Sequence, residues 1–104
     1  MTKVIELHLT FPDKEAAQLF CREVVEEKLA ACCNIYPVQS VYIWQTKLID
    51  EPEYAALLKT MPSKLEPLLL KINSNHPYEV PAVTWAEVNA TPPYLDWMIY
   101  SLEG

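Results

Sequence analysis

The segment 32–46 constrains the fold most, because its apolar residues do not alternate with polar ones. It is rich in the β-branched and aromatic types that favour strands. Successive side chains of a strand point to opposite faces, so Val41 and Ile43 share one face while Tyr42 and Trp44 share the other. Helices of the same chain can cover only one of these faces. We therefore expect another copy of the chain to cover the second face.

Proline supplies nearly all the breaks between the expected elements, since the 104 residues include nine Pro and a single Gly at the last position. Pro37 inside the long strand indicates a bulge or an edge position. Acidic residues ahead of Pro52 predict a hairpin connection over 48–52. No repeat, low-complexity tract or linker interrupts the chain, which indicates a single domain over 1–104.

Hydrophobic periodicity predicts the other elements, with a period of two for strands and of three to four for helices. Asp13 is expected to cap the first helix, Ser63 with Glu66 to form a capping box at the second, and Thr91 to cap the third. The expected order is a strand at 5–11, a helix whose apolar stripe runs from Ala17 to Leu29, the strand at 32–46, a strand at 53–61, a helix with a stripe from Leu65 to Ile72, a loop at 73–81, a strand at 82–88, and a last helix carrying apolar residues over 94–102.

This β-α-β-β-α-β order with an extra C-terminal helix predicts an α+β fold. Two right-handed crossovers around a central hairpin give the ferredoxin-like sandwich, with an antiparallel sheet and both crossover helices on one face. The other face stays open, and the long second strand is a natural place for pairing between subunits.

Charge and composition exclude several classes of function. The net charge of −6 repels phosphate backbones, and no cluster of Lys or Arg offsets it, so we expect no nucleic-acid partner. A cationic ligand, including a metal ion, is electrostatically permitted. We expect no membrane partner, because no apolar run approaches the roughly 20 residues of a membrane span. The absence of a signal-peptide pattern and three unframed Cys indicate the cytoplasm.

Several short motifs, in order along almost the whole chain, resemble the CutA divalent-ion tolerance family. The resemblance implies a ferredoxin-like fold, a very stable PII-like homotrimer and a part in tolerance of copper or other divalent metals. The motifs are Thr10, Pro12-Asp13, Lys28-Leu29-Ala30-Ala31-Cys32-Cys33-Asn34-Ile35, Ser40 with Tyr42 and Trp44, Lys59-Thr60, His76-Pro77-Tyr78-Glu79-Val80-Pro81 and Tyr94-Leu95-Asp96-Trp97.

The chain also departs from this family pattern. Thr46 stands before Lys47 where members often carry Gly, and Cys33 stands where an aliphatic residue is usual. Some members carry a Cys and a second His at the positions of Leu9 and Asn75. Only His76 therefore remains of that metal-ligand set, and it is the candidate ligand for Cu(II) or another divalent cation.

We expect a small-ligand cleft between subunits, formed by Lys59, His76, Tyr78, Glu79 and Trp44. A charge in an apolar strand needs a carboxylate partner, which for Lys59 would be Glu79 or Glu87, and a structural ion pair explains this lysine equally well. For His76 we favour a structural corner over a ligand, because turn chemistry alone explains the neighbouring prolines. The expected trimer interface comprises Tyr42, Trp44, Tyr94 and Trp97.

No pattern indicates an enzyme or a closed metal site. Cys32 and Cys33 are adjacent in a strand, so their side chains point to opposite faces and cannot chelate one ion together. Cys21 on its helix stripe and His8 on the first strand read as structural residues. Without internal glycine there is no phosphate-binding loop and no nucleophile elbow.

These observations favour a homotrimeric, CutA-like protein linked to metal tolerance that binds divalent metal weakly. One alternative is a PII-like trimeric signalling module that binds a small molecule between subunits, an analogy at the level of the fold. A second is a purely structural or anchoring trimer.

Overall fold

The computed structural model describes residues 3–103, which form a four-stranded antiparallel sheet and three α-helices. In chain order the elements are β1 (Lys3–Phe11), α1 (Lys14–Glu26), β2 (Cys32–Trp44), β3 (Lys47–Thr60), a 3-10 turn η1 (Pro62–Lys64), α2 (Leu65–Asn75), β4 (Thr84–Asn89) and α3 (Pro92–Glu103).

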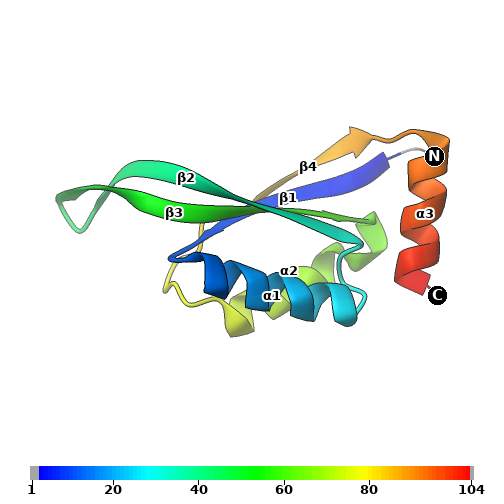
Figure 1. Cartoon of the computed structure of the whole chain (residues 1–104), viewed down its shortest axis with the longest axis horizontal. Helices are drawn as coiled ribbons and strands as arrows, with labels where there is room; N and C mark the ends of the chain where they lie inside the picture. The colour runs from blue at the N-terminus through cyan, green and yellow to red at the C-terminus, as the bar shows by residue number, and fades with distance from the viewer. Residues whose placement is uncertain (1–2, 104) are drawn as a thin grey trace.

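The sheet has the strand order β2-β3-β1-β4. Figure 1 shows α1 and α2 side by side on one face, while α3 stands at the end of the sheet opposite to the β2–β3 hairpin. The order and the layers confirm the predicted ferredoxin-like α+β fold with an extra C-terminal helix. None of the helices within 3–103 is long and apolar enough to cross a membrane.

The core lies between the sheet and the two crossover helices. Leu7 and Leu9 of β1 are fully buried there, as their period of two predicts. The helices contribute Phe20, Val24 and Ile72 to the same cluster. The alternate residues of β1 lie on the other face of the sheet, where α3 packs against Val4 through Met98 and Leu102 at one end and leaves the β2–β3 hairpin uncovered.

Helix α1 begins as predicted but ends earlier than its apolar stripe. The Asp13 carboxylate accepts a hydrogen bond from the Ala16 amide at 2.8 Å, which is an N-cap contact. At the other end Lys28 has a φ of 60°, and the Leu29 amide donates to the Val24 carbonyl at 2.8 Å. This is a Schellman motif, so Leu29 packs beyond the helix rather than within it.

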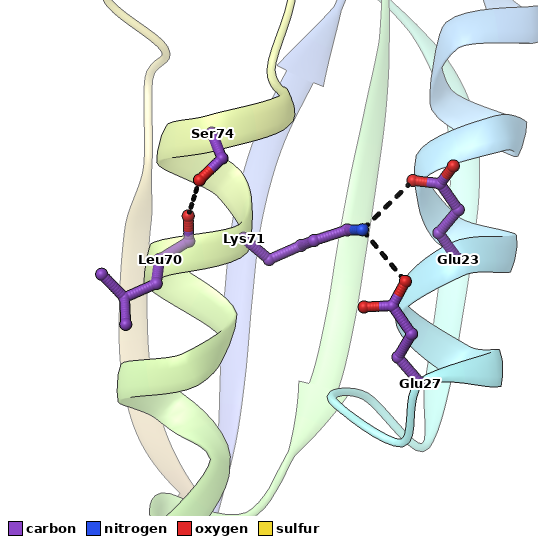
Figure 2. A network of polar contacts seen from close by, with 5 residues as sticks. All are labelled: Glu23, Glu27, Leu70, Lys71 and Ser74. Carbon is purple, nitrogen blue, oxygen red and sulfur yellow. Dashed lines mark hydrogen bonds and ion pairs between the residues drawn. The ribbon is translucent and has the colours of Figure 1, made fainter.

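A lysine joins the two crossover helices. The Lys71 ammonium lies 3.0 Å from Glu27 and 3.5 Å from Glu23, which occupy successive turns of α1 (Figure 2). The hydrogen bond with Glu27 raises the pKa of Lys71. The contact links α2 to α1, while the buried apolar residues of both helices hold them against the sheet.

The hairpin turn is not where the sequence predicted it. β2 and β3 pair without interruption from Cys32 opposite Lys59 to Trp44 opposite Lys47, so 48–52 lies inside β3. The turn is Gln45-Thr46, whose φ angles of 50° and 67° are those of a type I′ turn. Pro52 is tolerated because this part of β3 pairs only with β2 and leaves its other edge free.

The predicted capping box at the second helix also does not form. Pro62 starts a 3-10 turn that already contains Ser63, and α2 follows with Lys64 at its N-cap position. Neither helix start has a capping hydrogen bond from a side chain. Pro67 falls in the first turn of α2, where its missing N–H removes no helical hydrogen bond.

Candidate functional site

A groove of about 700 Å³ lies at the foot of the β2–β3 hairpin, on the open face of the sheet. The two strands form its floor, the end of β1 closes one side, and the loop between α2 and β4 forms a wall. The lining residues are Thr10, Ser40, Val41, Tyr42, Trp44, Glu53, Pro77, Tyr78, Glu79, Val80 and Ala82.

A buried carboxylate lies in this groove. Glu53 is only 6% exposed, and the hydroxyl of Tyr78 donates a hydrogen bond to it. Burial, together with this hydrogen bond and the charge of Glu53, raises the pKa of Tyr78 well above its usual range. The phenol therefore stays a neutral donor, and it ties the loop to β3.

His76 fixes the base of the same loop from behind the groove. Its Nδ1 accepts a hydrogen bond from the Tyr78 amide at 3.0 Å, so Nε2 carries the proton and donates to the Thr10 carbonyl at 2.7 Å. The ring stacks on Phe11 with 4.6 Å between centroids. Burial lowers the pKa of His76 and favours the neutral form.

This arrangement does not fit a metal ligand at His76, because both ring nitrogens are already in hydrogen bonds. Nor do the residues 3–103 bring together any group of three or more His, Cys, Asp or Glu that could hold a metal ion. The two hydrogen bonds of His76 instead hold the loop after α2 against the end of β1, which is a structural role.

Lys59 does not join the other four residues of the expected cleft within one chain. It lies six residues along β3 from Glu53, a distance of about 20 Å in a strand. Its Nζ lies 5.9 Å from the centroid of the Tyr94 ring, a cation–π contact in place of the expected ion pair. Glu79 is at the groove, and Glu87 is opposite Ile5, on the helix-covered face.

The four residues expected at the trimer interface occupy two separate places. Tyr42 and Trp44 lie on the hairpin, more than 40% exposed. Tyr94 and Trp97 belong to α3 and stack on each other with 5.6 Å between ring centroids. Figure 1 shows these elements at opposite ends of the molecule.

The cysteines lie as expected of successive strand residues. Cys33 packs against the core, where a hydrogen bond with Cys21 and burial raise its pKa. Cys32 is opposite Lys59 and lies on the open face. The pKa of Tyr94 is raised mainly by burial and to a smaller extent by the neighbouring Cys32. All three described cysteines are free thiols.

The sequence analysis missed Glu53. The signal in the sequence was the face of the strand on which Glu53 lies. Glu53 shares a face of β3 with Ala55 and Leu57 and not with the exposed acidic residue Asp50. A carboxylate on that face needs a partner, and the Tyr78 hydroxyl supplies one. Thr10 and Ser40 had appeared only as motif residues, and both line the groove.

Comparisons with known proteins give one consistent result. A family model described as CutA1 divalent ion tolerance protein matches residues 5–101. The chain is 33% identical to the divalent-cation tolerance protein CutA of Thermotoga maritima over 96 residues, which is 91% of this chain and 95% of that protein. It is 40% identical to the chloroplastic protein CutA of Arabidopsis thaliana over 90% of its own length, but it spans only 53% of that relative.

Solved structures agree with this result. The structure of CutA from Synechococcus elongatus superposes with a TM-score of 0.93 at 33% identity, covering 98% of this chain and 92% of that one. Because sequence and fold match over nearly the full length, the chain belongs to the CutA1 divalent ion tolerance protein family.

Proposed function

We propose that this chain acts in divalent-cation tolerance as a cytoplasmic homotrimer assembled through the β2–β3 hairpin. The observation that carries the proposal is that the hairpin projects beyond the helices (Figure 1) and carries exposed apolar side chains on both faces. Ile43 and Leu48 are 72% and 71% exposed on one face, and Tyr42 and Trp44 are on the other. A two-stranded hairpin is marginally stable alone, and such a surface in a small protein marks an interface.

The position of a second apolar surface supports a closed ring. Trp97 and Tyr100 of α3 are also exposed, at the end of the molecule opposite the hairpin. When two different surfaces at opposite ends meet, the contact is head-to-tail, and such contacts form a ring if the rotation closes. The family resemblance makes three the expected number of copies.

Direct binding of a divalent metal is proposed to be weak. Cu(II) favours imidazole ligands, and both nitrogens of His76 are in hydrogen bonds. Metal tolerance then depends on the assembled protein rather than on a strong metal site in each chain. The family description is that of a tolerance protein rather than of an enzyme.

A growth assay tests the proposal. Cells lacking their own CutA protein are supplied with the wild type, with Ile43→Asp on the hairpin, or with Leu70→Asp on the exposed side of α2 as a matched control. We expect the wild type and the control to restore growth at raised copper concentrations and Ile43→Asp to fail. Equal growth with all three variants would remove the hairpin from the function.

A second candidate is a module that binds a small molecule, and the groove favours it. Its volume is within the range of ligand sites, and a buried carboxylate lies inside it.

A further inference from the structure

The charge of the groove has one sign. Among the described residues that line it, Glu53 and Glu79 are acidic and none is Lys, Arg or His. The lysine on this face of the hairpin is Lys47, which is opposite Trp44 and six residues along β3 from Glu53, about 20 Å in a strand. The electrostatic complement of the groove is a cation.

Glu53 identifies where the positive charge would lie. It is the one buried acidic side chain within 3–103, and no cationic side chain pairs with it there. The neutral hydroxyl of Tyr78 provides one hydrogen bond. A buried carboxylate is stable when its charge is both hydrogen-bonded and compensated, so a cation in the groove would complete this environment.

The aromatic side chains identify the kind of cation. Tyr42, Trp44 and Tyr78 line the same groove as Glu53, with Tyr78 in contact with the carboxylate and Trp44 at the far end, opposite Lys47. Aromatic rings attract cations, and they do so most effectively for alkylated ammonium groups, which have little need of hydrogen-bond acceptors. A divalent metal ion needs several oxygen ligands instead, and the residues 3–103 offer no cluster that could hold one.

We propose that the groove binds a small molecule bearing a methylated ammonium group, with its charge near Glu53 and its methyl groups against Tyr42 and Tyr78. The volume of about 700 Å³ accommodates such a molecule. All three residues belong to one chain, but Tyr42 is also expected at the contact between copies, so the ligand and a neighbouring copy would share this face of the hairpin. In the proposed trimer that copy would close the open side of the groove.

Choline is a suitable probe, and 3,3-dimethylbutan-1-ol is its neutral isostere. Calorimetry on the full chain is expected to show saturable binding of choline, with one site per chain. The isostere is expected to bind about tenfold more weakly, because it keeps the shape and loses the charge. Absence of saturable choline binding, or equal binding of the isostere, would overturn the proposal.

Two pairs of variants locate the site. Glu53→Gln keeps an acceptor for Tyr78 and removes the charge, so choline binding should weaken about tenfold. Glu87→Gln removes an exposed charge outside the groove and should bind choline like the wild type. Identical affinities of these two variants would place the ligand elsewhere.

Tyr42→Leu and Trp97→Leu form the second pair, and they keep the test decisive if Glu53→Gln does not fold. Both side chains are exposed to a similar degree, but only Tyr42 lines the groove. Choline affinity should fall for Tyr42→Leu alone, and an equal effect of both variants would contradict the proposal. Light scattering on each variant separates loss of the ligand from loss of the oligomer.

Discussion

The Tyr78 hydroxyl donates a hydrogen bond to the buried carboxylate of Glu53, and this contact joins the loop after α2 to β3. Two residues earlier, His76 joins the same loop to the Thr10 carbonyl at the end of β1. The wall of the groove is therefore held by two polar contacts to two neighbouring strands. Each contact can be tested separately.

Tyr78→Phe removes the only hydrogen bond shown for the Glu53 side chain within the described chain. A buried acceptor left without its donor should lower the free energy of unfolding by about 1–3 kcal/mol. Urea unfolding of both proteins measures the difference. Tyr100→Phe is the matched control, because Tyr100 is 76% exposed and should change little. Equal stability of Tyr78→Phe and the wild type would show that the contact is not formed in solution.

His76 should make stability depend on pH on the acidic side of neutrality. Burial lowers its pKa in the folded protein below the unfolded value of about 6.5, so the unfolded chain binds the proton first. The stability contributed by neutral His76 is complete above pH ~6.5 and is lost as the pH falls through the lowered folded value. Melting temperatures from pH 8 to pH 5 should fall more steeply for the wild type than for His76→Gln. Parallel curves would contradict the assigned protonation state.

The position of the hairpin turn can be tested by placing the turn-favouring pair Asn-Gly at each of the two candidate positions. Gln45 and Thr46 both have positive φ, which is unfavourable for side chains with a Cβ and for β-branched Thr above all. Replacing this pair with Asn-Gly, the preferred type I′ sequence, should stabilise the protein by about 1 kcal/mol. The same Asn-Gly pair at Asp50-Glu51 lies inside β3 and should destabilise it. The reverse result would place the turn at 48–52.

Copper titration separates the two interpretations of His76. Because both ring nitrogens are in hydrogen bonds, the heat of Cu(II) binding should be the same for the wild type and for His76→Gln. A melting curve must first show that the variant is folded. Weaker copper binding by His76→Gln would mean that the imidazole ring turns to bind copper and that His76 is a ligand as well as a structural residue.

The fold could be predicted because local pattern and tertiary structure agree in most of the chain. β1, α1 and α2 are each buried on a single side. The alternation of apolar and polar residues in β1 and the apolar stripes of the two helices therefore appear in the sequence itself. Asp13 illustrates this agreement, since its capping contact involves an amide only three residues away.

The turn was misplaced because turn chemistry and tertiary position disagree there. The side chain of Asp50 accepts a hydrogen bond from Nε2 of the Gln39 side chain at 2.8 Å across the strands, which no local rule indicates. Both Pro37 and Pro52 occur where the strand has a free edge, so neither ends its strand.

The groove could be predicted only in part. The motif at 76–81 drew attention to Tyr78 and Glu79, and both line it. Glu53 was missed because its burial depends on a loop that is 25 residues away in the sequence. Lys59 lies about 20 Å from Glu53 along β3, so its place in a cleft formed by two subunits stays a prediction.

The assembly of the hairpin remains the central prediction. Size-exclusion chromatography with light scattering on the wild type at micromolar concentration measures it directly. A homotrimer requires three times the chain mass of 12.0 kDa, which is about 36 kDa. A single species at 12 kDa would show that both apolar faces of the hairpin remain in water, and it would contradict the trimer.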